Sequence, residues 1–278
     1  MGFRRLIKIY KKDGLYSIYL RILRFFGYKL PYNNIIEKFK FKVQEKIILI
    51  SKNKVLNGYY KDTFLSCKSS WGIPDFSSKL LGLYEKQVQD KIVELKNKFN
   101  LSFIVNFGSS DGFHILGLLK NNFFKKGFAF EINTNEQKNL IENIKKNKLE
   151  KKIEVFEKAN FIDVFKILTI KDLTKTLFLV DIEGGEFDLF NEAMNQVYLK
   201  KIKKSYFIIE DHSWFLKSKK ITNFKKSIEM NFNVKILEDS GRDPHIFDFL
   251  KNFSDDEKWL MMSEGRPLSM YWYILTPK

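Results

Sequence analysis

LSFIVNFGSSDGFHILGLLKNNFFKKGFAFEIN, residues 101–133, predicts a strand, a tight turn, a helix and a second strand. The apolar run 103–107 is typical of a buried parallel strand, and a glycine-bounded turn follows at 108–112. Apolar residues then recur at helical spacing over 115–119. The second strand ends in Glu131. A nucleotide-like ligand can use the free N–H groups of such a helix start and the carboxylate at the next strand tip.

The glycine spacing discriminates between cofactors. Gly108 and Gly112 have three residues between them, so the dinucleotide pattern G-x-G-x-x-G is absent. Asn106 lies two residues before the first glycine. This pattern, an acidic or amide residue followed by x-G-x-x-x-G, resembles the first motif of class I S-adenosylmethionine-dependent methyltransferases. Together with Glu131, this spacing favours a cofactor site over a plain strand-to-helix turn.

The composition narrows the class of protein. The chain has 278 residues and is 44% hydrophobic, which excludes a disordered protein. Its formal charge of +16 comes almost entirely from lysine. Nucleic-acid binding is not favoured, because no basic strand with interleaved aromatic residues stands out. The single cysteine, Cys67, excludes an intrachain disulfide and indicates a reducing, cytoplasmic location. The three histidines exclude a multi-histidine metal site.

Residues 1–57 are expected to form a basic extension with an amphipathic helix. Apolar residues from Leu15 to Phe26 follow helical spacing in the first 30 residues. The helix is expected to pack on the main domain or on a second protomer. The alternative is a membrane-surface helix, which would place the protein at the inner face of the membrane. No membrane span or signal peptide is expected.

The segment before the first motif is expected to be a lid or substrate segment. Residues 47–50 and 63–65 read as short strands. Within 66–100, a loop containing Trp71 leads into a helix over 86–98. Trp71 either belongs to a lid or is a core aromatic residue. Residues 58–278 are expected to form the cofactor domain.

Two later strands end in carboxylates. The run 177–180 is followed by Asp181 and Glu183, and the run 206–209 is followed by Glu210, Asp211 and His212. Ligands bind beyond the carboxyl ends of parallel strands, so these side chains fall where substrate and cofactor should meet. Gathering two carboxylates and a histidine at one strand tip is costly unless they are paired.

The rest of the sheet follows the same alternation. A helix is expected at 134–147, and a third strand over 153–157 precedes Asn160. A strand near 234–237 and a final aromatic strand over 270–275 close the chain. A last strand hairpinned against its predecessor is the usual end of a class I methyltransferase sheet.

Several segments together resemble the FkbM family of methyltransferases, over residues 58–278. The resemblance implies a Rossmann-like α/β fold, with a mostly parallel seven-stranded sheet, an antiparallel C-terminal strand and here an N-terminal helical and strand extension. It also implies O-methylation of a hydroxyl on a sugar, glycan or glycosylated small molecule. Asn106 departs from the acidic residue often found in the first motif. The matching segments are SSWGIPDFSSKLLGLYE (69–85), VNFGSSDG (105–112), AFEIN (129–133), LVDIEGGE (179–186), IIEDH (208–212), GRDPHIFDFL (241–250) and WLMMSEGRP (259–267).

The residues at the strand ends predict a reaction centre and, with the resemblance, a set of cofactor residues. His212 is expected to take the proton of the acceptor hydroxyl, because an ordinary imidazole is largely neutral at pH 7. Asp181 and Glu210 are expected to orient it, or alternatively to bind a divalent cation such as Mg²⁺. The residues expected to bind the cofactor are Tyr84, Glu85, Asn106, Gly108, Ser109, Asp111, Gly112, Glu131, Asn160 and Asp181.

Two other functions stay open from the sequence. One is a cofactor-fold module without catalysis that binds a partner through its basic N-terminus. The other is an RNA methyltransferase, which only the net charge of the chain favours. An oligomer is also compatible with the sequence.

Overall fold

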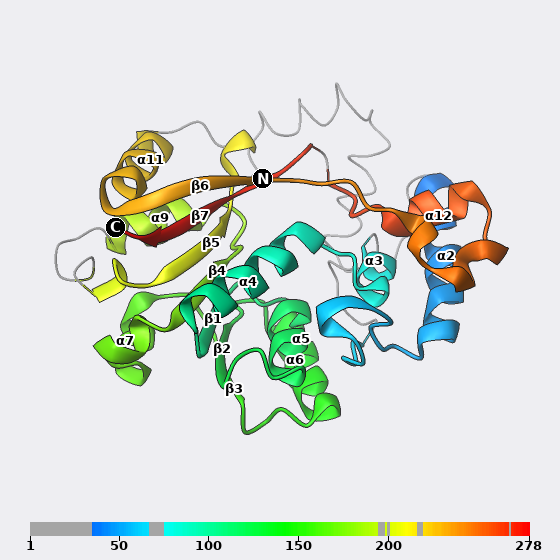
Figure 1. The fold of residues 1–278 in the computed structure, drawn as a ribbon, viewed down its shortest axis with the longest axis horizontal. Coiled ribbons are helices and arrows are strands. Elements are labelled where there is room, and N and C mark those ends of the chain that lie inside the picture. The colour runs from blue at the N-terminus through cyan, green and yellow to red at the C-terminus, as the bar shows by residue number, and fades with distance from the viewer. Residues whose placement is uncertain (1–34, 67–74, 194–197, 199–200, 216–218, 267) are drawn as a thin grey trace.

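The computed structural model describes residues 35–66, 75–193, 198, 201–215, 219–266 and 268–278. The predicted helix within residues 1–30 and the Trp71 loop lie outside these ranges. Helices cover both faces of one central sheet, and a smaller helical unit stands beside it (Figure 1). No helix among the described residues is long and apolar enough to cross a membrane.

The seven strands form one sheet in the order β3-β2-β1-β4-β5-β7-β6. The first five are parallel, and β7 runs antiparallel to both of its neighbours. This is the mostly parallel seven-stranded sheet that the sequence predicted, including its antiparallel C-terminal strand. The strands are β1 (Phe103–Phe107), β2 (Lys126–Phe130), β3 (Ile153–Phe156), β4 (Thr176–Val180), β5 (Tyr206–Glu210), β6 (Phe232–Glu238) and β7 (Tyr271–Pro277).

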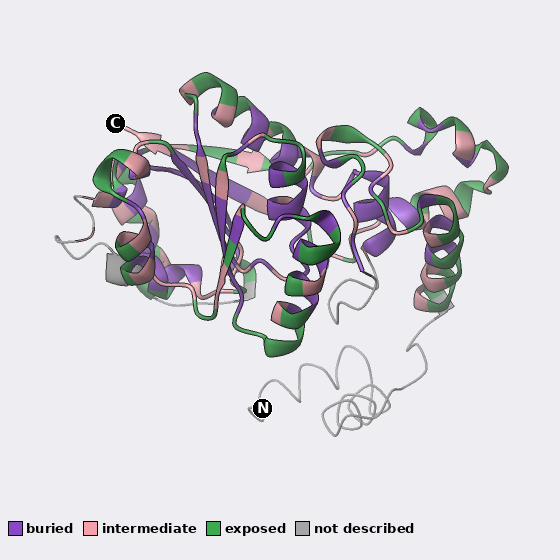
Figure 2. Cartoon of the chain, turned by 90° about the horizontal axis from the view of Figure 1, so that it is seen from below, coloured by how far each residue is buried: buried purple, intermediate pink, exposed green. Residues whose placement is uncertain are grey.

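Alternation along β1 divides the core into two layers. Ile104 packs with the helices of one face, whereas Val105 and Phe107 pack with those of the other. Strand residues point alternately to the two faces, so a nearly continuous apolar run is what a doubly covered strand requires. Figure 2 shows the strands buried between helices whose outer surfaces are exposed. The first layer holds α4 (Lys86–Phe99), α5 (Phe113–Lys120) and α6 (Thr134–Asn147), and the second holds α7 (Phe161–Ile167), α9 (Glu186–Ala193) and α11 (Lys219–Asn231).

The smaller unit joins distant parts of the chain. Helix α2 (Ile35–Ser51) contacts α3 (Phe76–Leu81) and α12 (Asp255–Met262), and α2 and α12 lie side by side in Figure 1. The predicted strand at 47–50 is wrong, since these residues lie within α2. Val43 and Ile47, four residues apart, are buried on one face of the helix, while Leu49 is 78% exposed. Packing of this helical stripe prevails over the β-propensity of consecutive isoleucines.

The second predicted strand of the extension, 63–65, is reduced to a single bridge between Lys54 and Phe64. The other short elements are η1 (Gly58–Tyr60), α8 (Ile170–Leu173), η2 (Ser213–Phe215), η3 (Pro244–Ile246) and η4 (Asp248–Asn252).

Candidate active site

The turn between β1 and α5 brings three strand ends together. Gly108 adopts φ +79°, and a Cβ there would lie 1.6 Å from the carbonyl oxygen of Asp181. Its N–H donates to the carbonyl of Phe130 at the end of β2. Only glycine fits this position, because a side chain would collide with the backbone at the end of β4. The glycine therefore lets the residues after β1, β2 and β4 line one pocket.

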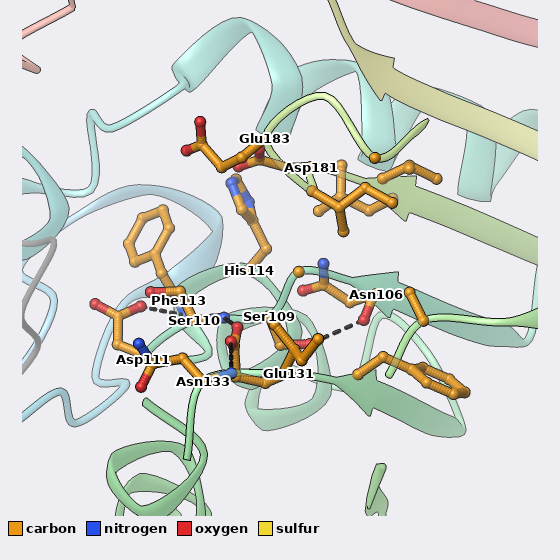
Figure 3. A pocket seen from close by; sticks show the side chains of 18 of the residues that line it. Asn106, Ser109, Ser110, Asp111, Phe113, His114, Glu131, Asn133, Asp181 and Glu183 are labelled. Atoms are coloured by element: carbon orange, nitrogen blue, oxygen red, sulfur yellow. Dashed lines mark hydrogen bonds between the residues drawn. The ribbon is translucent and has the colours of Figure 1, made fainter. Parts of the chain in front are cut away.

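Glu131 lies at the tip of β2 with its carboxylate held by backbone groups. Its Oε2 accepts from the N–H of Ser110 at 2.7 Å, and its Oε1 accepts from the N–H of Asn133 at 2.8 Å (Figure 3). A carboxylate has about four lone-pair directions, so further donors can be accommodated. The next residue, Ile132, is 72% exposed and also lines the pocket. A fixed carboxylate thus stands beside an apolar surface.

These residues line a pocket of about 930 Å³ at the carboxyl ends of the strands. The position agrees with the general rule for ligands of open α/β sheets. Asn106 is 3% exposed, and its side-chain amide makes no hydrogen bond with any residue that the structure describes. A buried amide is costly to leave unpaired, so a ligand group is its natural partner. The predicted cofactor residues that line the pocket are Tyr84, Glu85, Asn106, Gly108, Ser109, Asp111, Glu131 and Asp181.

Two predicted cofactor residues do not line the pocket. Gly112, at φ +88°, begins α5 and packs against Leu116 and Leu140. Asn160 caps α7 instead, because its Oδ1 accepts from the N–H of Asp163 at 2.7 Å. Lys158 and Ala159 reach the pocket from this loop, whereas Asn160 does not line it.

The predicted reaction centre comes together, although not as expected. Nε2 of His212 lies 3.6 Å from Oδ1 of Asp181 and 3.8 Å from Oε2 of Glu210. Asp181 lines the pocket, whereas Glu210 and His212 lie behind it and are 4% and 3% exposed. Nδ1 of His212 lies 3.2 Å from Oε1 of Glu186, a buried residue at the start of α9. The role of His212 as the base stays a prediction, and Asp181 is the member of this group that lines the pocket.

The two titrating groups at the centre have shifted pKa values. Burial and the nearby carboxylates of Glu210, Glu85 and Glu183 raise the pKa of Asp181 well above its ordinary value. Burial opposes protonation of His212, but the hydrogen bond to Glu186 and the charge of Glu210 raise its pKa overall. The imidazole is therefore a better cation than base, and Asp181 is a carboxylate whose basicity is increased.

Arg266 connects the parts of the site. Its guanidinium binds the carboxylates of Glu85 and Glu210, and its Nε donates to Oε2 of Glu264 at 2.8 Å. The same group lies 5.1 Å from the ring centroid of Trp272. A planar fork with five donors suits several carboxylates at once, and lysine could not replace it. The sequence analysis did not assign Arg266 to the site. The signal that could have indicated it is that Arg266 is one of the few arginines in a chain whose basic residues are mostly lysines.

Asp181, Glu210 and His212 could also hold a metal ion, since one ligand atom from each lies within 4.8 Å of the others. The contact of Nδ1 with Glu186 leaves Nε2 facing the carboxylates, as metal-bound histidines are commonly oriented. Arg266 competes with any cation for Glu210, because its guanidinium already binds that carboxylate.

No family model matches the chain, and no curated protein matches it. Solved structures do show similarity. The "delta-N METTL16 MTase domain" has a TM-score of 0.49 at 15% identity, covering 85% of this chain and 98% of that one. A protein described as an O-methyltransferase from Klebsiella pneumoniae gives 0.44 at 7%, covering 94% and 97%. A protein described as a tRNA (m1A22) methyltransferase from Streptococcus pneumoniae, in complex with S-adenosyl-L-methionine, gives 0.41 at 15%, covering 68% and 73%. Likeness at this level assigns neither a substrate nor a reaction to this chain.

Proposed function

We propose that this chain is an S-adenosylmethionine-dependent methyltransferase. The observation that carries the proposal is the position of Glu131. Its carboxylate ends β2, is fixed by two backbone N–H groups, and faces a pocket that also contains the Gly108 turn and Asp181. A carboxylate in this place can accept both hydroxyls of a ribose.

The residues around Glu131 fit the remaining parts of such a cofactor. The exposed side chain of Ile132 offers an apolar surface to an adenine ring. The unpaired amide of Asn106 lies on the β1 side of the pocket and can donate to or accept from the amino-acid end. An adenosine with an amino-acid chain would therefore give the Asn106 amide and the Ile132 side chain partners that they lack among the described residues.

The chemistry assigned to the chain's own residues follows from their positions. When bound, the cofactor supplies a methyl group on a sulfonium, open to in-line attack by an acceptor oxygen. Asp181 lines the pocket and takes the proton of the acceptor hydroxyl, since its Oδ1 makes no hydrogen bond with the residues that the structure describes. His212 and Glu210 act as positioning residues behind it. Holding the two reactants in line contributes several kcal/mol by itself.

A hydroxyl of a sugar, glycan or glycosylated small molecule is the acceptor we propose. The resemblance to the FkbM family supports this class. The pocket adds support, because Asp181, Glu183 and Asp188 line it, and carboxylates accept hydrogen bonds from polyols. Glu183 is 66% exposed, so its charge meets an arriving acceptor. The same charge would repel a phosphate backbone, which disfavours the RNA methyltransferase alternative despite the net charge.

Further features extend the proposal or stand as its alternatives. A divalent cation at Asp181 and Glu210, in place of the pairing of Glu210 with Arg266, is an alternative that would orient acceptor oxygens and lower the hydroxyl pKa. A cytoplasmic location with membrane contact through residues 1–30, and an oligomeric state, stay predictions.

Binding and transfer test the proposed function in two steps. Isothermal titration of the full chain with S-adenosylhomocysteine separates a cofactor-binding protein from a module that only keeps the fold. Methyl-labelled S-adenosylmethionine is then offered with separate pools of glycosylated small molecules, polysaccharides and total RNA. Label in a glycoside or polysaccharide supports the proposal. Label confined to RNA would replace the acceptor class, and the absence of cofactor binding would remove the proposal.

A further inference from the structure

Lys79 places a buried ammonium group in the wall of the pocket. Its side chain is 6% exposed, and Nζ donates to Oδ2 of Asp111 at 2.9 Å. Nζ also lies 3.9 Å from Oδ2 of Asp75 and 4.9 Å from the ring centroid of Tyr84. An ammonium has three N–H donors, and this one makes one hydrogen bond among the described residues. Two donors are thus available beside the pocket.

The charge of Lys79 contrasts with the other groups in the pocket. Most ionisable residues lining it are carboxylates, and Lys158, the other lysine in the lining, is exposed at the loop after β3. A ligand carboxylate would be repelled along most of this surface. Lys79 is the buried lysine among the described residues that line the pocket, and charge-assisted hydrogen bonds are strongest at such a buried cation.

The turn after β1 links Lys79 to the proposed ribose site. Ser110 donates its N–H to Glu131, and the adjacent Asp111 receives the ammonium of Lys79. The carboxylate proposed for the ribose and the buried ammonium therefore contact consecutive residues of one turn. A ligand that extends from its ribose by a short amino-acid chain can reach both.

We propose that Lys79 binds the carboxylate at the amino-acid end of the cofactor. This inference rests on the proposed function, because it names the residue that recognises one end of that cofactor. Lys79 belongs to α3, which precedes the sheet in the chain, so the smaller helical unit contributes directly to the cofactor site. The competing explanation is that Lys79 only neutralises Asp111 and stabilises the glycine turn.

Three ligands distinguish cofactor recognition from a structural role. S-adenosylhomocysteine carries the carboxylate and the ammonium. Its decarboxylated analogue keeps the ammonium, and 5′-methylthioadenosine lacks both groups. Isothermal titration of the full chain should show that the wild type prefers S-adenosylhomocysteine to the decarboxylated analogue by about 10- to 100-fold, the range of a charge-assisted hydrogen bond.

The variants Lys79→Met and Lys79→Arg complete the test. Lys79→Met should bind S-adenosylhomocysteine about 10- to 100-fold more weakly, while its affinity for the other two ligands changes by about twofold or less. Unchanged binding of 5′-methylthioadenosine also shows that the variant is folded. Lys79→Arg should keep most of the preference for the carboxylate, and the control Lys146→Met, at an exposed lysine of α6 that does not line the pocket, should keep all of it.

Several outcomes would overturn the inference. The inference would be overturned if the wild type bound S-adenosylhomocysteine no better than its decarboxylated analogue, and this outcome does not require that any variant folds. Equal loss of all three ligands by a folded Lys79→Met would assign Lys79 to the structure of the turn alone. If the wild type bound none of the ligands, the proposed function itself would fail, a result distinct from binding without carboxylate preference.

Discussion

Nε2 of His212 lies 3.6 Å from Oδ1 of Asp181, so the imidazole stands behind the carboxylate that lines the pocket. The other ring nitrogen lies 3.2 Å from Glu186. The ring is therefore held between carboxylates, and its raised pKa favours the charged form. In the proposed function, Asp181 removes the proton and His212 positions Asp181.

Asp181→Asn should lower kcat by about 100-fold or more, because loss of a general base typically costs 10²- to 10⁴-fold. His212→Gln should have a smaller effect on kcat, since glutamine can still donate to a neighbouring carboxylate. Steady-state kinetics with an acceptor found in the labelled screen give both values. Glu154→Gln is the control, because this carboxylate is exposed on β3 and does not line the pocket. A larger loss in His212→Gln than in Asp181→Asn would return the role of base to the histidine.

Glu131→Gln should weaken the binding of S-adenosylhomocysteine by about 10- to 100-fold, because the ribose hydroxyls would lose a charged acceptor. The amide keeps one oxygen for the backbone N–H of Ser110 or Asn133, so the turn should stay intact. Isothermal titration measures the affinity, and Glu154→Gln on the exposed side of β3 is the control. An affinity equal to that of the wild type would exclude Glu131 from the cofactor site.

Methyl transfer should survive removal of divalent cations by EDTA, because the guanidinium of Arg266 already neutralises Glu210. Activity is compared in EDTA, in buffer and with added Mg²⁺ or Mn²⁺. Loss of activity in EDTA that Mg²⁺ restores would contradict this prediction. It would instead support a cation at Asp181 and Glu210.

The sequence predicted the sheet because its strands are buried on both faces. Runs such as Leu177 to Val180 are apolar throughout, and each ends where a polar residue begins the loop. Strand tips of a parallel sheet meet at one edge, so Glu131 and Asp181 could be placed in one pocket from local pattern alone.

Contacts between residues far apart in the sequence could not be predicted from local patterns. Arg266 reaches Glu85, 181 positions away, and nothing local to either residue reports the pairing. Lys79 likewise belongs to a short helix whose packing depends on α2 and α12. Asn160 shows the opposite case, because its role as the N-cap of α7 follows from a recognisable local pattern.

Ile47→Ala should destabilise the protein by about 2 to 5 kcal/mol, because this fully buried side chain fills the contact of α2 with the core. Leu49→Ala, two residues further along the same helix, should change stability by about 0.5 kcal/mol or less, since Leu49 is 78% exposed. Urea unfolding followed by circular dichroism measures both. Equal effects would mean that the helix does not present these two faces as described.

Acid should weaken the fold partly through Glu85. Burial alone would raise the pKa of this 4% exposed carboxyl, but Arg266 and His114 outweigh burial and lower the pKa to about 2. A carboxyl with a pKa depressed from 4.5 stabilises the fold at pH values above 4.5. That contribution is lost as the pH falls from there towards 2.

Glu85→Gln should therefore be less stable than the wild type at pH 7 by about 3 to 5 kcal/mol, because Arg266 loses one partner of a buried ion pair. Its stability should also fall less steeply between pH 5 and pH 3, since the titrating group is gone. Urea unfolding at several pH values measures both effects, with Glu154→Gln in an exposed ion pair as the control. If the curves of Glu85→Gln and the wild type ran parallel across this range, the acid sensitivity would belong to other carboxylates.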